Sequence, residues 1–379
     1  MSPPRSNVDL AIVGAGPAGL AVAIFASPSG LRTVICERSA GPPDKACGEG
    51  LMPAGLRVLG ALGARDLLGP EDCSPIEGIR YIEEDGTTLT GRLPAGGGLG
   101  IRRTALAAAL AKTAAGDGVE IRWGTTATGF AMEKGFVEVQ TSAGKLRAGL
   151  LVVADGLHSP LRRIAGLDAP ALDAPPKNGT TVPRERFGLR QHFQVPPWSR
   201  FVEVHLGVGV EAFVTPAGAS RVGIAFLWEK GGVTGPTSIE ALLRHFPALA
   251  ERLSGAKSDS EPRGAGPFAH SVRSRIADRL VLVGDAAGYV DAITGEGLSM
   301  AFVCAEKLGS LLPAVLAGGA TRQALEPYER AASSEFRHYA LVCRSVLALA
   351  RRPRLRSQIF ALLRHTPGLF DRILAGALA

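Results

Sequence analysis

The sequence has few cysteines, and their spacing fits neither a metal site nor a disulfide framework. The 379 residues include no CxxC pair, and the five cysteines are Cys36, Cys47, Cys73, Cys304 and Cys343. Zinc sites and secreted disulfide scaffolds need closely spaced pairs or even sets of cysteines, so this pattern argues against both. We therefore expect no bound metal and a reduced, cytoplasmic environment.

Long uninterrupted apolar segments are also missing. Residues 8–26 are broken by Asp9 and three glycines, and only Arg5 precedes them as a charge, which does not fit a signal peptide. No other segment reaches membrane-spanning length without a charge or a proline. The 42 basic and 35 acidic residues give a net charge of +7. This excess suits an anionic ligand or surface, but it is too diffuse to indicate nucleic acid.

Low-complexity blocks and short repeats are absent as well. The 48 glycines and 26 prolines are scattered through apolar runs, which is typical of turns and close backbone approaches. With 46% hydrophobic and 20% charged residues, fibrous and disordered classes are excluded. The chain is long enough for a large core in two domains, or in one domain with a substantial insertion.

The N-terminal region contains a glycine-rich turn between a strand and a helix. Residues 9–13 predict a strand, the sequence GAGPAG follows at 14–19, residues 20–26 predict a helix, and a second strand at 33–36 ends at Glu37. Such glycines permit a tight turn, a backbone approach to a pyrophosphate and close helix–strand packing. An acid after the second strand can accept the hydroxyls of an adenosine ribose. The pattern predicts a dinucleotide site.

Two further motifs lie at the ends of predicted strands. Residues 150–154 lead into Asp155-Gly156 and a helix start at 158–163. Residues 280–283 lead into Gly284-Asp285, and a second glycine-opened helix begins after residues 294–297. The N-terminus of a helix can stabilise the negative charge of a reduced flavin.

Together the three motifs resemble those of the FAD-dependent oxidoreductases of the aromatic-hydroxylase fold, over most of residues 8–305. The resemblance implies an α/β fold, with a Rossmann-like FAD-binding domain, an inserted antiparallel β-sheet substrate domain and a C-terminal helical segment. It also implies FAD as cofactor and NAD(P)H as reductant. The implied cofactor-binding residues are Gly14, Gly16, Ala18, Gly19, Glu37, Arg38, Cys47, Gly48, Arg103, Asp155, Gly156, Gly284, Asp285, Thr294, Gly295, Glu296 and Gly297.

Residues 44–53 and the Thr-Gly-Glu-Gly sequence at 294–297 refine the resemblance. Both are similar to the branch that holds geranylgeranyl reductases, some flavin halogenases and quinone-pathway or polyketide-tailoring hydroxylases. In that branch the loop at Cys47 lies beside the isoalloxazine ring, where we expect a small residue that permits close packing rather than sulfur chemistry. Residues 210–216 lack the tryptophan typical of the halogenases and reductases, which argues against a halogenase and weakens the match to prenyl reductases.

The resemblance divides the chain into three parts. Residues 1–75, 100–175 and 268–330 are expected to form the FAD-binding domain, residues 76–99 and 176–267 the substrate sheet, and residues 331–379 the C-terminal helices. Four short runs rich in β-branched and aromatic residues predict the strands of this sheet, at 187–195, 201–206, 212–216 and 221–228.

Several polar residues occur on these predicted strands: Arg190, His192, Glu203, His205 and Glu211. Alternation does not say which face of the sheet meets the flavin, and we expect each of them to face solvent. As candidates for catalysis the sequence offers Cys47, Arg190, His192 and His205.

The last 43 residues, 337–379, have a composition of their own. They contain eight arginines, no lysine and one acid, Asp371, and their spacing predicts two amphipathic helices broken near Pro353. Two interpretations stay open. The helices pack on the FAD domain with a solvated face, or they contact an anionic membrane or a carrier protein that brings a lipophilic substrate.

For the activity, the resemblance favours an NAD(P)H-dependent monooxygenase that hydroxylates an aromatic, quinol-like or polyketide-type small molecule through a flavin C4a-hydroperoxide. The alternative is an FAD-dependent double-bond reductase of the geranylgeranyl reductase type. A flavin halogenase and a non-catalytic flavoprotein are further alternatives. No second nicotinamide fingerprint appears in the sequence, so a partner reductase is an open alternative to direct reduction by NAD(P)H.

Overall fold

The computed structural model describes residues 7–94, 96–169, 185–366 and 368–378. Its first layer is an eight-stranded sheet in which β1, β2, β8, β11 and β19 run parallel. An antiparallel hairpin of β9 and β10 extends from β11. The strands are β18 (Ile276–Ala277), β19 (Leu280–Leu282), β11 (Gly144–Val153), β1 (Val8–Val13), β2 (Thr33–Cys36), β8 (Glu120–Arg122), β10 (Phe136–Thr141) and β9 (Ala127–Glu133).

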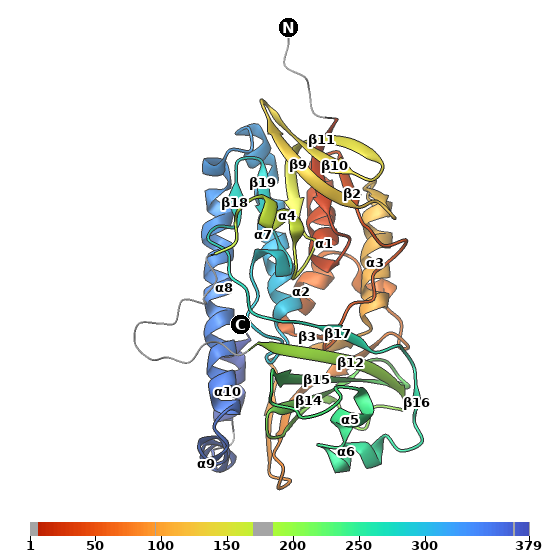
Figure 1. Cartoon of the computed structure of the whole chain (residues 1–379), viewed down its shortest axis with the longest axis vertical. Coiled ribbons are helices and arrows are strands. Elements are labelled where there is room, and N and C mark those ends of the chain that lie inside the picture. Colours follow the sequence, from red (N-terminus) through yellow and green to blue (C-terminus); the bar gives the residue numbers. More distant parts are fainter. Residues whose placement is uncertain (1–6, 95, 170–184, 367, 379) are drawn as a thin grey trace.

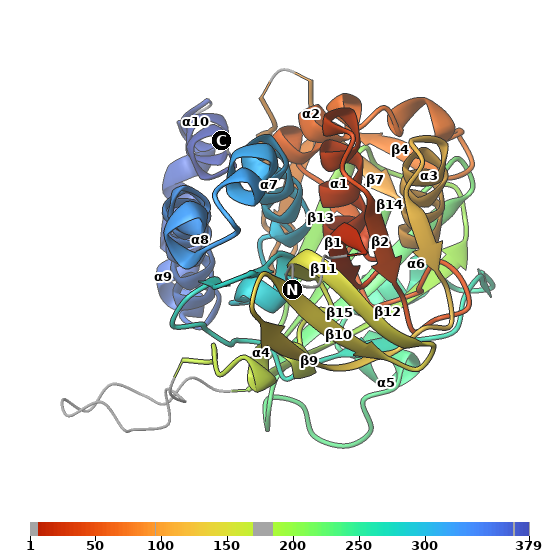
Figure 2. The same cartoon turned by 90° about the horizontal axis from the view of Figure 1, so that it is seen from above.

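Both faces of this sheet are covered, which explains why its strands read as continuous apolar runs. One face packs against α1 (Pro17–Ala26), α3 (Arg103–Gly116) and α7 (Gly297–Ala317). The other face packs against the β9–β10 hairpin and α4 (Pro160–Ile164). Seen from above, α7 lies between α1 and the long helix α8 (Arg322–Ala350) (Figure 2).

The second layer is another eight-stranded sheet, below the first in Figure 1. Its strands pair antiparallel except that β13 and β5 are parallel, so the expected purely antiparallel sheet needs this correction. The reason is that β5 and β6 come from a distant part of the chain and join along one edge. The strands are β16 (Lys257–Ser258), β17 (Arg263–Ala265), β12 (Arg186–Gln194), β15 (Arg221–Glu229), β14 (Val210–Pro216), β13 (Phe201–Leu206), β5 (Gly78–Ile82) and β6 (Thr88–Arg92).

Smaller elements connect and cover the two layers. Two short helices pack on one face of the second sheet, α5 (Ile239–Leu243) and α6 (Pro247–Arg252). The remaining elements are β3 (Gly50–Leu51), β4 (Cys73–Ile76), β7 (Gly98–Ile101), α2 (Pro53–Ala61) and the short 3₁₀ helices Ser27–Ser29, Arg65–Leu67 and Gly284–Ala287. The α/β fold class expected from the sequence is confirmed by this arrangement.

The C-terminal region differs from the expectation in two ways. Helix α8 runs without a break across the predicted domain boundary at 330/331, which therefore falls inside a helix. The tail then forms α9 (Pro353–Arg364) and α10 (Leu369–Ala377) instead of one helix after Pro353, because Gly368 has a φ of 80° that interrupts the helix. The predicted boundary at 175/176 lies outside the described residues.

Helix α7 is long and apolar enough to cross a membrane by length and composition alone. In the fold it lies against α1, α2 and α8, and Ala305, Leu308 and Leu312 on it are fully buried. Interior packing therefore accounts for its apolar character.

Candidate cofactor and substrate site

A cavity of about 970 Å³ lies between the two sheets, at the carboxyl ends of β1 and β11. This is the place where α/β folds bind nucleotides, and the volume suits a large ligand. Most of the predicted cofactor residues line it, namely Gly16, Ala18, Arg38, Cys47, Gly48, Arg103, Asp155, Gly156, Gly284, Asp285, Thr294, Gly295 and Gly297. Four predicted cofactor residues do not line it: Gly14, Gly19, Glu37 and Glu296.

The glycine turn explains why two of these four lie behind the cavity wall. Gly14 has a φ of +106°, and a Cβ there would lie 2.4 Å from the Ala154 carbonyl oxygen. A Cβ on Gly19 would lie 2.1 Å from the Gly14 carbonyl oxygen. Gly16 faces the cavity and leaves the amides at the start of α1 accessible, because no side chain caps this helix. A pyrophosphate fits such a free helix N-terminus.

Glu37 is 4% exposed, and its side chain lies buried beneath the glycine turn. Its Oε2 accepts a hydrogen bond from the Ala15 amide at 2.8 Å, and its Oε1 accepts one from the Ser39 amide at 2.9 Å. The carboxylate therefore fixes the backbone of the turn, and its contact with a ribose stays a prediction.

Two cations lie over this turn. The Arg103 Nη2 atom lies 3.8 Å from the place of a Cβ on Gly16, and the buried Nε of Arg103 has no hydrogen-bond partner among the described residues. Lys45 lies beside Gly156, and burial together with the charge of Arg103 lowers the pKa of Lys45. Two cations side by side at a helix N-terminus favour an anionic ligand. Lys45 was not predicted as a site residue, although its position two residues before Cys47 could have indicated it.

Two acids face the cavity from the ends of their strands. The Asp155 Oδ2 accepts a hydrogen bond from the Leu161 amide at 3.4 Å, whereas its buried Oδ1 has no partner among the described residues. Burial raises the pKa of Asp285, and the charges of Arg103 and Lys45 oppose that shift. Carboxylate oxygens of this kind fit the hydroxyl donors of a ribityl or ribose chain. The anion-binding turn and these acceptors therefore match the chemical groups of FAD.

The expected flavin end holds the Cys47 loop and the start of α7. Cys47 is half-buried, and its Sγ accepts a hydrogen bond from the Glu49 amide at 3.3 Å, which shapes the loop. Gly295 has a φ of +68°. Glu296 occupies the N-cap position of α7, but its side chain makes no capping hydrogen bond, and burial raises its pKa to about 7.

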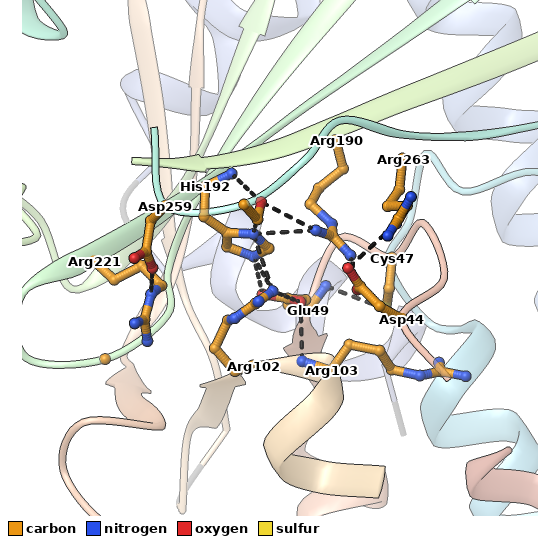
Figure 3. Close-up of polar contacts among 12 residues, drawn as sticks. Asp44, Cys47, Glu49, Arg102, Arg103, Arg190, His192, Arg221, Asp259 and Arg263 are labelled. Atoms are coloured by element: carbon orange, nitrogen blue, oxygen red, sulfur yellow. Dashed lines mark hydrogen bonds and ion pairs between the residues drawn. The ribbon is translucent and has the colours of Figure 1, made fainter. Parts of the chain in front are cut away.

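A buried polar network joins this loop to the second sheet (Figure 3). The Glu49 side chain is 1% exposed, and its Oε2 lies 2.6 Å from His192 Nε2. Its Oε1 accepts hydrogen bonds from the Arg103 amide at 2.9 Å and from Arg102 Nη1 at 3.3 Å. Arg190 Nη2 donates to Asp44 Oδ1 at 2.6 Å and to the Lys45 carbonyl at 3.0 Å. The network fixes residues 44–49 and the start of α3 against β12.

The protonation states of the central pair follow from this packing. Burial alone would raise the pKa of Glu49, but the hydrogen bond from His192, the charge of Arg102 and the hydrogen bond from the Arg103 amide lower it below its ordinary value. Burial lowers the pKa of His192, and Glu49 opposes that shift. At neutral pH the pair is therefore an ionised Glu49 that accepts a hydrogen bond from a neutral His192.

The expectation that the polar strand residues face solvent is wrong. Arg190, His192, Glu203 and Glu211 are all buried because each has a polar partner inside the fold. Of the four catalytic candidates, Cys47 and Arg190 line the cavity, whereas His192 lies behind Glu49 and does not. His205 lies on the far face of the sheet beside Glu203, with its ring 6.2 Å from that of Phe246, so it is removed from the site.

Sequence reasoning also missed a second buried ion group. Arg186, whose side chain is 4% exposed, donates to Glu211 at 2.8 Å and to Asp291 at 2.9 Å. This group joins β12 and β14 to the segment before α7. Among the described residues, no cluster of three or more histidine, cysteine or acidic side chains could hold a metal ion.

The wall that the second sheet gives to the cavity is largely apolar. Alternation along β13 turns Val202 and Val204 toward the cavity and Glu203 and His205 away from it. Phe213, Leu227 and Ile79 continue this wall on β14, β15 and β5. The site thus combines a polar, cationic half next to the first sheet with an apolar half next to the second sheet.

A Rossmann-type sheet with an anion-binding turn, and a second sheet that closes the cavity over it, defines the class of FAD-dependent oxidoreductases. The comparisons agree. The FAD binding domain family model matches residues 7–340, so the chain belongs to that family, and it is a flavoprotein that binds FAD.

Similar curated proteins are reductases. Digeranylgeranylglycerophospholipid reductase of Methanosarcina mazei is 28% identical over 306 residues, 78% of this chain and 72% of that protein. The protein of the same name from Methanosarcina acetivorans is 28% identical over 342 residues, 85% and 79% of the two chains.

Similar solved structures show the same fold. A flavoprotein/dehydrogenase from Cytophaga hutchinsonii has a TM-score of 0.81 at 22% identity, covering 97% of this chain and 93% of that chain. The flavin-dependent brominase Bmp2 has a TM-score of 0.80 at 17% identity, covering 98% and 93%. A geranylgeranyl bacteriochlorophyll reductase-like protein from Thermoplasma acidophilum has a TM-score of 0.72 at 19% identity, covering 92% and 89%.

Proposed function

We propose that the protein is an FAD-dependent reductase of carbon–carbon double bonds in a prenyl-type lipid. The observation that carries the proposal is the likeness to digeranylgeranylglycerophospholipid reductases over about four fifths of the chain. The monooxygenase that the motifs alone led us to expect has less support than its reductase alternative.

The apolar half of the cavity supports a lipophilic substrate. Val202, Val204, Phe213 and Leu227 offer branched and aromatic side chains with no hydrogen-bonding groups. Transfer of an isoprenoid chain from water to such a wall is favourable in proportion to the apolar area buried. The wall and the Cys47 loop line the same cavity, so a double bond lying along the wall would be within reach of the expected flavin end.

The chain's own residues hold and orient the reactants. The N-terminus of α1, Arg103 and Lys45 would hold the pyrophosphate of FAD, and Asp285 and Asp155 would accept hydrogen bonds from its hydroxyls. FAD, when bound and reduced, would supply both hydrogens of such a reduction, one as a hydride and one as a proton. The Glu49–His192 pair holds residues 44–49 in place at the cavity, and the apolar wall would exclude water from the reacting double bond. NAD(P)H or a partner reductase is the proposed source of electrons.

Hydroxylation of an aromatic substrate is the second candidate, because Phe187, Phe213 and Trp228 also line the cavity. The two functions differ in product. Purified holoenzyme with NADPH and a detergent-solubilised geranylgeranyl lipid should give a product heavier by two hydrogens, with and without air. A product heavier by one oxygen, formed from a phenol or quinol in air only, would replace the reductase with the monooxygenase.

A cavity variant makes the assay specific to this site. Val204→Trp places a large ring in the apolar half and should reduce turnover at least about tenfold while FAD stays bound. Met132→Trp adds the same ring on the exposed strand β9 and should leave turnover unchanged. Equal turnover in both variants would mean that the lipid does not occupy the apolar half.

A further inference from the structure

Exposed apolar side chains concentrate on the three C-terminal helices. The large apolar residues exposed there are Leu341 (65%), Leu355 (42%), Leu362 (64%), Leu369 (37%) and Ile373 (48%). They are more than half of the large apolar side chains that are exposed in the described part of the chain. Apolar surface gathered in this way marks an interaction site more often than scattered single residues do.

Helix geometry separates these residues from the packed side of each helix. Leu355 and Leu362 are two turns apart on one side of α9, whereas Arg356 and Phe360 on the opposite side are buried. On α10, Phe370 and Leu374 pack inward, and Leu369 and Ile373 form a separate exposed pair. Packing within the chain therefore explains the inner residues and leaves the outer ones unexplained.

The same three helices are strongly basic, and on α8 the exposed Arg337 and Arg344 lie four and three residues from Leu341, on its side of the helix. The only acid of residues 337–379, Asp371, accepts a hydrogen bond from the Arg92 amide at 2.7 Å. Seven of the eight arginines in this stretch are exposed: Arg337, Arg344, Arg351, Arg352, Arg354, Arg364 and Arg372. Leucines interleaved with arginines and almost no acids are complementary to lipid head groups that carry negative charge.

This surface lies directly outside the apolar end of the cavity. The Tyr81 ring, which lines the cavity, lies 6.0 Å from the Phe360 ring and 6.2 Å from the Phe370 ring, measured between centroids. Buried Arg356 pairs with Glu83 at 2.7 Å and fixes α9 to the end of β5. Exposed Val208, in the turn after β13, donates its amide hydrogen to Glu84 Oε1 at 3.0 Å, next to Glu83.

We propose that the outer face of α8, α9 and α10 docks on an anionic lipid bilayer. The exposed leucines enter the head-group boundary, the arginines contact lipid phosphates, and the apolar end of the cavity then faces the membrane. The docking itself is independent of the reaction; only the delivery of a lipid substrate along this route rests on the proposed function.

The test is co-sedimentation of the full-length, FAD-loaded protein with vesicles. Vesicles of phosphatidylcholine with phosphatidylglycerol should bind the protein, and binding should weaken at high salt and on phosphatidylcholine alone. Leu355→Ser/Leu362→Ser should weaken binding at least about tenfold. Arg337→Gln/Arg344→Gln, which removes the two charges beside Leu341, should weaken it about thirtyfold on anionic vesicles. The control Met132→Ser/Lys134→Gln, on the β9–β10 hairpin at the far end of the molecule, should bind as the wild type does.

Three results would overturn the proposal. The first is no binding to anionic vesicles by protein that retains FAD. The second is self-association that the leucine variant abolishes without vesicles, which would assign the surface to a second copy of the chain. The third is binding to an acidic carrier protein but not to vesicles. Reductase turnover is measured separately in detergent, so failure of docking and failure of the proposed function are distinguishable.

Discussion

Replacing Glu49 with glutamine should weaken both the fold and FAD binding. The carboxylate is buried between His192, Arg102 and the Arg103 amide. Glu49→Gln removes the negative charge. One of the two carboxylate oxygens, which accept hydrogen bonds from His192, Arg102 and the Arg103 amide, becomes an NH₂ group that cannot accept one. Hydrogen bonds to charged groups contribute about 1.5–3 kcal/mol each, and breaking one side of a buried pair costs about 3–5 kcal/mol. We expect a loss of about 3 kcal/mol in the free energy of unfolding at neutral pH.

The effect on FAD follows from the backbone contact. Glu49 fixes the amide of Arg103, whose guanidinium lies over the glycine turn, so the variant should bind FAD about tenfold more weakly. Urea denaturation of the apoprotein and fluorescence titration with FAD measure the two quantities. Because the pKa of Glu49 is lowered in the fold, its stabilisation is present above its ordinary value of 4.5 and is lost as pH falls through the lowered pKa. The stability difference from wild type should therefore shrink in acid.

Glu83→Gln is the matched control. It removes the same charge from a buried pair with Arg356, far from the glycine turn. Similar loss of stability with unchanged FAD affinity is expected for this variant. If Glu49→Gln also leaves FAD affinity unchanged, the network does not position the cofactor site and our interpretation of it is wrong.

Four further predictions concern single residues. Gly19→Ala should abolish FAD binding, because its Cβ would lie 2.1 Å from the Gly14 carbonyl oxygen, and flavin absorbance of the purified protein checks this. Asp285→Ala should weaken FAD binding by about 1.5–3 kcal/mol, measured by titration of the apoprotein, whereas unchanged affinity would remove its assigned contact. Cys47→Ala should keep most turnover, and a loss of several orders of magnitude with FAD bound would show that the thiol takes part in the chemistry. Burial lowers the pKa of His270 from 6.5 to about 4, so protons favour the unfolded chain below pH 6.5. Through this group the free energy of unfolding of the wild type should fall by about 2 kcal/mol between pH 7 and pH 5. In His270→Asn the fall should be smaller by that amount, and denaturation at the two pH values measures the difference.

The sequence predicted the parts of the site that depend on local pattern. Gly16, Asp155 and Asp285 each follow closely on a predicted strand, and the carboxyl ends of parallel strands meet at one edge of a sheet, so their common position at one cavity could be anticipated. The polar network could not, because His192 and Glu49 are 143 residues apart, and alternation along β12 does not say which face is covered. The contact between Arg186 and Asp291 could not be predicted for the same reason, because these residues are 105 positions apart in the sequence.

The C-terminal helices show a different limit. Their periodicity and the break at Pro353 were visible in the sequence, but Gly368 was not recognised as a second break. The parallel pairing of β13 with β5 also escaped prediction, because it depends on where the β5–β6 hairpin docks and not on either segment alone.

One measurement tests the central claim most directly. The holoenzyme, reduced by dithionite under anaerobic conditions, is mixed with a lipid that carries geranylgeranyl chains, and flavin absorbance and lipid mass are followed in the same sample. Our account predicts that the flavin is reoxidised without oxygen and that each reoxidised flavin yields one double bond reduced by two hydrogens. A flavin that stays reduced until air is admitted, with no saturated lipid formed, would contradict it.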